Sequence, residues 1–163
     1  MDHAGPRLQR MQSSLPAEPE SVGRVRRAVA EIAVTAGVPP EQVDAIRLAV
    51  SEAVTNTVLH AYGTGDGEIH ALAELAGDEL WVLITDDGRG LHAGPESRGL
   101  GLGLALMSEV CDGFSVLERA NGGTELRLRF KIPVATVAPD RAHLRGSVSS
   151  ATAAPSSTFS TTM

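Results

Sequence analysis

Apolar positions recur at two different spacings along the chain, and these spacings predict its helices and strands. Apolar residues return every three or four positions from about residue 18 to residue 36 and again from about residue 40 to residue 60, which predicts two helices. Gly37 ends the first helix, and the Pro39-Pro40 pair opens the second, because proline is tolerated in the first turn of a helix. A third helix is expected over residues 101–111.

Strands are predicted over residues 68–76, 79–85, 114–119 and 125–132. Glycine-containing turns separate the strands of each successive pair, and a glycine-rich loop beginning at residue 86 leads into the third helix. We therefore expect an α/β two-layer sandwich, with the helices on one face of a mixed, mostly antiparallel sheet.

The predicted elements define one domain with a segment on each side. We expect residues 1–17 to form a flexible N-terminal arm and residues 18–133 to form the folded domain. Residues 134–163 are mostly Ala, Ser, Thr and Pro. They offer too little apolar surface to offset the entropy lost on ordering, so a disordered tail is predicted.

Composition narrows the function classes. No apolar run approaches the ~18 residues of a membrane span, the N-terminus lacks an apolar signal region, and the single cysteine, Cys111, has no internal disulfide partner, which favours the cytoplasm. A net charge of -6 argues against direct nucleic-acid binding but not against a basic protein partner. Lys131 is the only lysine, so no Walker phosphate-binding loop can be assigned.

Two groups of residues carry candidate chemistry, although each has a structural alternative. Glu52 and Asn56 stand four positions apart on the second helix and therefore share a face, which a solvated polar stripe would also explain. Asp86, Gly88 and Gly90 follow an apolar strand. The aspartate can accept a hydrogen bond from an exocyclic amine such as that of adenine, and the glycines allow close approach of a ligand, although a tight turn would look the same.

A third group, Gly99 to Gly103, carries three glycines at the start of the third helix. Leu104 stands where a dinucleotide-binding fingerprint needs its last glycine, so that function is not supported. Backbone N–H groups of such a loop still form an anion site at a helix N-terminus. Glycines there lower helix stability by roughly 1 kcal/mol each, which a phosphate ligand or a moving lid would justify. Gly123-Thr124 opens the last predicted strand.

The four groups in this order resemble the GHKL ATPase family and, within it, the bacterial anti-sigma-factor serine/threonine kinases. The segment Ser51 to Asn56, followed by His60-Ala61-Tyr62, looks like the N box of that subgroup, and the resemblance extends over residues 18–132. It implies the Bergerat ATP-binding fold, with ATP and Mg²⁺ as cofactors. Family members typically act as homodimers on a sigma factor and a STAS-type anti-anti-sigma antagonist.

The resemblance also implies a role for individual residues. Glu52 would be the general base, Asn56 would ligate Mg²⁺, and Arg24 on the first helix would contact a partner protein. The other ATP contacts that it implies are Asp86, Gly88, Gly90, Arg98, Gly99, Leu100, Gly101, Leu102, Gly103 and Thr124.

Other functions remain open. Eight residues separate Gly90 from Gly99, which is a short lid, so an ATP-dependent binding switch with little or no kinase activity is the main alternative. A cysteine nucleophile at Cys111 is disfavoured, because this residue ends an apolar helix and is expected to be a buried structural thiol.

Overall fold

The computed structural model describes residues 10–62, 66–90 and 100–133, and it describes the side chains of the last range from residue 103 onward. These described ranges contain three helices, with the bounds α1 Pro19–Thr35, α2 Pro40–His60 and α3 Leu100–Val110. The five strands are β1 Arg10–Pro16, β2 Glu68–Ala76, β3 Glu79–Asp86, β4 Gly113–Glu118 and β5 Thr124–Lys131. The helices and the four later strands lie within a residue or two of their predicted positions.

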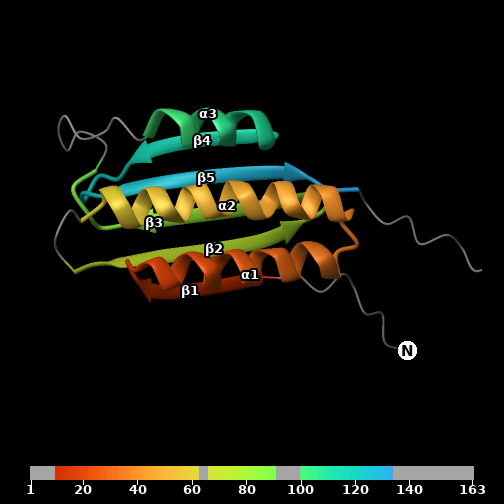
Figure 1. Cartoon of the computed structure of the whole chain (residues 1–163), viewed down its shortest axis with the longest axis horizontal. Helices are drawn as coiled ribbons and strands as arrows, with labels where there is room; N and C mark the ends of the chain where they lie inside the picture. The colour runs from red at the N-terminus through yellow and green to blue at the C-terminus, as the bar shows by residue number, and fades with distance from the viewer. Residues whose placement is uncertain (1–9, 63–65, 91–99, 134–163) are drawn as a thin grey trace, which may run out of the picture.

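The strands form one sheet in the order β1-β2-β3-β5-β4, with β3 at its centre. Figure 1 shows α1, α2 and α3 side by side over one face of this sheet, which confirms the two-layer sandwich. The sheet was expected to be mixed and mostly antiparallel, and every pair of neighbouring strands that the structure describes is antiparallel. Hairpin turns join β2 to β3 and β4 to β5, which accounts for the antiparallel direction of those two pairs.

The N-terminal arm was predicted wrongly for residues 10–16, which form the edge strand β1. This strand pairs with β2 along its whole length, from Arg10 opposite Glu74 to Pro16 opposite Glu68. Leu15 points into the core and is only 7% exposed. The chain then turns into α1, with the Ser21 hydroxyl donating to the Pro16 carbonyl at 2.7 Å. Burial of Leu15 and pairing along β2 therefore order a segment of weak apolar character.

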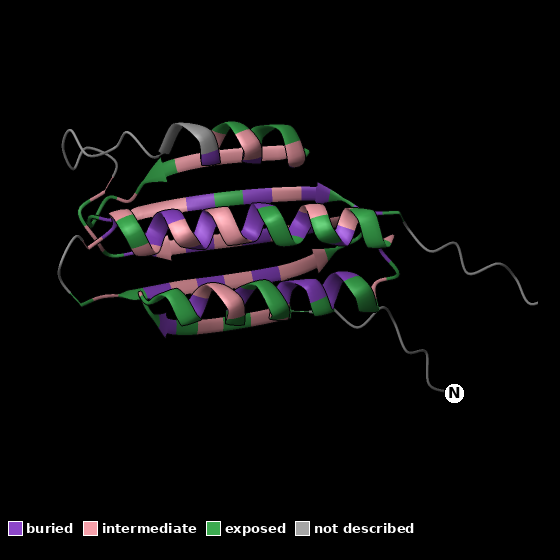
Figure 2. Cartoon of the chain, viewed as in Figure 1, coloured by how far each residue is buried: buried purple, intermediate pink, exposed green. Residues whose placement is uncertain are grey.

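The core lies between the helices and the sheet. Along α2, Ile46, Val50, Ala53 and Val54 are fully buried, as the helical spacing requires of the face that packs on a sheet. The strands β2 and β3 alternate between buried and partly exposed residues along most of their length, because successive side chains point to opposite faces (Figure 2). No helix in the described part of the chain is long and apolar enough to cross a membrane.

Candidate nucleotide-binding site

The C-terminal half of α2 faces the start of α3, and the two helices meet at Glu52, Asn56 and Gly103. A Cβ atom added to Gly103 would lie 2.9 Å from Glu52 Oε2 and 3.1 Å from Asn56 Nδ2. Asn56 is 8% exposed, and its Nδ2 has no hydrogen-bond partner among the described residues. A buried amide without a partner is costly, and it points to a ligand that the amide contacts. The fold thus brings together two of the groups predicted from sequence.

Asp86 ends the central strand β3 and is 2% exposed. Its Oδ1 accepts hydrogen bonds from the backbone N–H groups of Gly88 at 2.9 Å and Thr124 at 3.2 Å. Burial raises the pKa of this carboxyl group, because desolvation outweighs the two hydrogen bonds and the Arg119 charge that lower it. Both bonds fall on Oδ1, so Oδ2 keeps its capacity to accept a hydrogen bond from a ligand.

The glycines near Asp86 are required by the chain's own packing. A Cβ at Gly88 would come within 2.2 Å of the Ala61 carbonyl oxygen, just beyond the end of α2. Gly90 has φ +75° and Gly123 has φ +84°, and a Cβ at Gly123 would lie 1.9 Å from the Asp86 carbonyl oxygen. The turn after β3 is therefore pressed between α2 and the β4–β5 turn. This contact explains Gly88 and Gly123 without a ligand, and it fixes the position of Asp86.

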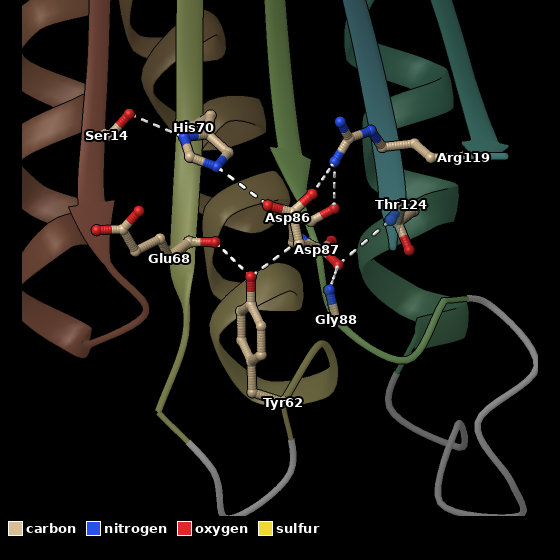
Figure 3. A network of polar contacts seen from close by, with 9 residues as sticks. All are labelled: Ser14, Tyr62, Glu68, His70, Asp86, Asp87, Gly88, Arg119 and Thr124. Atoms are coloured by element: carbon tan, nitrogen blue, oxygen red, sulfur yellow. Dashed lines mark hydrogen bonds and ion pairs between the residues drawn. The ribbon is translucent and has the colours of Figure 1, made fainter. Parts of the chain in front are cut away.

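Sequence reasoning assigned no role to a polar network on the other side of this turn (Figure 3). Arg119, directly after β4, donates from Nη1 to the Asp86 carbonyl at 2.9 Å and also to the Asp87 carboxylate. The Asp87 carboxylate faces His70 Nε2 on β2 at 3.5 Å. His70 Nδ1 in turn lies 2.8 Å from the hydroxyl of Ser14. No local sequence pattern signals these contacts, because they join residues more than fifteen positions apart.

The Tyr62 hydroxyl completes the network from the segment after α2. It accepts a hydrogen bond from the Asp87 backbone N–H at 3.0 Å and donates to the Glu68 carbonyl at 2.5 Å. Tyr62 was matched to the N box by resemblance, yet its contacts are with the turn after β3. It therefore links the end of α2 to the residue that follows Asp86.

The other residues predicted for the site either lie elsewhere in the fold or are not fully described by the structure. Arg98 and Gly99 fall outside the described residues. Leu100, Gly101 and Leu102 form the first turn of α3, and only their backbone is described. Arg24 is exposed on α1, which α2 separates from α3 in Figure 1, so it is not part of this site.

The alternative nucleophile, Cys111, is buried directly after α3. Burial raises the pKa of its thiol to about 12, with a smaller contribution from the neighbouring Asp112 charge. A thiol in this environment is protonated at neutral pH and is a poor nucleophile. The structure therefore favours a structural role for this residue.

Comparison with known protein families assigns this fold to a class of ATPase domain. Residues 15–130 match the histidine kinase-like ATPase domain family, and the chain belongs to that family.

The relatives include named bacterial regulators. The serine-protein kinase RsbW of Listeria innocua is 37% identical over 114 residues, which cover 60% of this chain and 73% of that protein. The anti-sigma F factor of Clostridium botulinum is 29% identical over 106 residues, which cover 58% of this chain and 74% of that protein. The RsbW protein of Bacillus velezensis is 30% identical over 134 residues, which cover 72% of this chain and 82% of that protein.

A solved structure has the same fold. The crystal structure of the RsbU and RsbW domains of a Mycobacterium tuberculosis protein superposes with a TM-score of 0.59 at 25% identity. The match covers 76% of this chain and 32% of the solved chain, so this chain spans about a third of that larger protein.

Proposed function

We propose that this chain binds ATP with Mg²⁺ and acts as a serine/threonine protein kinase that also sequesters a sigma factor. Its protein substrate is a STAS-type anti-anti-sigma antagonist, and it works as a homodimer in the cytoplasm. The ATP site is proposed from the positions of two buried polar side chains. A buried carboxylate with a remaining acceptor atom, at Asp86, lies at the end of the central strand, while a buried unpaired amide, at Asn56, faces a glycine in the first turn of α3.

The base end of the site is Asp86 with Thr124. The exocyclic amine of adenine donates to Asp86 Oδ2, while Oδ1 stays bonded to the turn and to the Thr124 backbone. Guanine presents a carbonyl oxygen at the equivalent position, and two acceptors facing each other repel. The buried carboxylate therefore selects ATP over GTP, because a mismatched polar group in a buried site loses its hydrogen bond and keeps its desolvation cost.

The phosphate end is the N-terminus of α3. Unpaired N–H groups and the helix dipole give such a terminus a partial positive charge that suits phosphate oxygens. Gly103 lets the first turn of α3 pack closely against Asn56, since a side chain there would meet the amide. The unpaired atom, Asn56 Nδ2, is a donor that would bond to a phosphate oxygen, and Oδ1 of the same amide is the kind of oxygen ligand that Mg²⁺ accepts. When bound, Mg²⁺ neutralises charge on the phosphates.

Glu52 lies one helical turn before Asn56, with its carboxylate next to Gly103. In this position it accepts the proton of the attacking serine or threonine hydroxyl. Phosphoryl transfer depends mainly on positioning and charge stabilisation, which the phosphate end of the site would supply, and an oriented base adds acceptance of the hydroxyl proton. The name of the Listeria relative, a serine-protein kinase, supports the proposed kinase activity, and that of the Clostridium relative, an anti-sigma F factor, supports the proposed binding of a sigma factor. Arg24, exposed on α1, is proposed to contact the partner protein.

The test separates binding from transfer. Asn56→Ala should reduce ATP affinity at least tenfold, whereas Glu52→Gln should keep ATP affinity within about threefold and abolish phosphate transfer. ATP affinity is measured by calorimetry with Mg²⁺. Transfer is measured with labelled ATP and antagonist recovered by pull-down, followed by mass spectrometry for phosphoserine or phosphothreonine.

Two outcomes would change the conclusion. Unaltered ATP affinity in Asn56→Ala would reject the site itself. ATP-dependent capture of a partner without any phosphate transfer by the wild-type chain would identify an ATP-dependent binding switch instead of a kinase.

A further inference from the structure

We propose that Arg119 and Asp87 are positioning residues that set the base selectivity of the nucleotide site by holding the main chain at Asp86. This inference rests on the proposed function, because it assumes that Asp86 receives the base. Neither residue contacts that carboxylate group. Their contacts are with the backbone that carries it (Figure 3).

Three hydrogen bonds hold Asp86 itself. Two are on its side chain, through the N–H groups of Gly88 and Thr124, and the third is on its main chain, through Arg119 Nη1 to the carbonyl at 2.9 Å. The peptide that joins Asp86 to Asp87 is held at both of its polar groups, because the Tyr62 hydroxyl accepts from its N–H at 3.0 Å and Arg119 donates to its carbonyl. Loss of the guanidinium group would release the carbonyl side of this peptide and, on this proposal, change the direction of Oδ2.

Asp87 anchors the guanidinium group of Arg119. The same Nη1 that contacts the Asp86 carbonyl also contacts the Asp87 carboxylate. Asp87 is held in turn by His70 Nε2 at 3.5 Å and by its own backbone N–H on the Tyr62 hydroxyl at 3.0 Å. Contacts from β2, from the segment after α2 and from the residue after β4 therefore converge on one peptide unit.

The backbone of Arg119 is equally well fixed. Its N–H donates to the Gly123 carbonyl at 3.1 Å, and its carbonyl accepts from Gly122 at 3.0 Å, which closes the turn between β4 and β5. This turn also carries Thr124. One turn thus holds Asp86 by its main chain, through Arg119, and by its side chain, through the Thr124 N–H.

A purely stabilising role does not account for this arrangement. The Arg119 side chain is 35% exposed and that of Asp87 is 63% exposed, and ion pairs this open contribute little to the stability of a folded chain. Replacement of Arg119 or Asp87 should therefore change mainly the geometry of the turn after β3. Because the base end of the pocket is built on this turn, the expected effect is on base recognition and not on folding.

The test compares two nucleotides that differ only in the base. ATP and GTP affinities are measured with Mg²⁺ for the wild-type chain and for the variants Arg119→Ala, Arg119→Lys and Asp87→Asn. Arg119→Ala should weaken ATP binding about tenfold, leave GTP binding within twofold and so collapse the ATP preference. Arg119→Lys keeps one donor and should recover part of it, and Asp87→Asn should give an intermediate loss. The control, Arg127→Ala, removes an exposed arginine paired with Glu125 on β5 and should change neither affinity.

The outcomes distinguish this inference from the proposed function. If Arg119→Ala binds both nucleotides equally less well, or keeps the wild-type ATP to GTP ratio, the positioning role is rejected while the ATP site stands. If the wild-type chain shows no ATP binding or no preference for ATP, the assignment of Asp86 to the base fails first. A melting temperature within a few degrees of wild type for Arg119→Ala excludes unfolding as the cause of lost affinity.

Discussion

Replacing Gly103 with alanine should separate stability from nucleotide binding. Alanine is favoured over glycine in a helix interior by about 1 kcal/mol, and Gly103 lies in the first turn of α3, where the gain is smaller. The added methyl carbon would lie 2.9 Å from Glu52 Oε2, the far end of a side chain that can rotate away. It would also lie 3.1 Å from Nδ2 of the buried Asn56, which must shift by a few tenths of an ångström.

These two effects on stability oppose each other, so the free energy of unfolding should change by no more than about 1 kcal/mol. ATP binding has no such compensation. In the proposed site, the methyl group would displace the Asn56 amide, whose oxygen is proposed to ligate Mg²⁺ beside the phosphates. We expect ATP affinity to fall at least tenfold, which corresponds to about 1.4 kcal/mol.

Urea denaturation gives the first quantity, and calorimetric titration with Mg²⁺-ATP gives the second. Ala105→Gly is the matched control, because Ala105 is exposed on the same helix and its replacement costs about 1 kcal/mol of helix stability without touching Glu52 or Asn56. Wild-type ATP affinity in Gly103→Ala, or a loss no larger than that in Ala105→Gly, would refute the reasoning.

Three further predictions concern other positions. Gly123→Ala should lower the free energy of unfolding by more than about 2 kcal/mol, because a positive φ and a backbone clash combine. Gly77 also has a positive φ but has open space around it, so Gly77→Ala should lower the free energy of unfolding by only about 1 kcal/mol. Urea denaturation measures both values, and equal losses would contradict the role of the clash. Asp86→Asn should abolish ATP binding, because its amide would oppose the adenine amine, yet its melting temperature at pH 7 should not fall. Because the pKa of Asp86 is raised in the folded state, the protein loses stability as pH rises from the pKa of the unfolded chain to that of the folded chain. An asparagine does not ionise and avoids this loss. A melting temperature several degrees below that of the wild type would therefore contradict the prediction. Cys111, with its pKa of about 12, should react with a thiol reagent at pH 8 only in urea, and rapid labelling of the native chain would show that the helix end opens.

The sequence predicted the helices well because their signals are local. The apolar spacing and the opening prolines placed α2 at Pro40–His60, which are also its bounds in the structure. The strand β1 was missed because it has few apolar residues, and its order comes from pairing with β2 and from burial of Leu15. An edge strand takes its stability from its neighbour, so its own pattern is weak.

In the candidate site too, local sequence signals could be read, whereas contacts between distant segments could not. Glu52 and Asn56 could be proposed from sequence because residues four positions apart on a helix share a face. Asp86 could be proposed because it follows an apolar strand. The contacts of Arg119 join residues 32 and 33 positions apart and depend on how the β4–β5 hairpin lies against β3. No short motif records that alignment. The residues proposed to recognise the nucleotide were therefore predictable, while those that hold one of them in place were not.

The edge strand β1 affects how the protein can be handled. A truncated chain starting at residue 18 would keep every residue of the proposed ATP site, but it would lose the partner of β2 and remove Leu15 from the core. The exposed edge of β2 would then present unpaired N–H and carbonyl groups, which invite pairing with a second molecule and aggregation. It would also free His70 from Ser14. Fusion tags and trimmed variants should therefore leave Arg10–Pro16 intact.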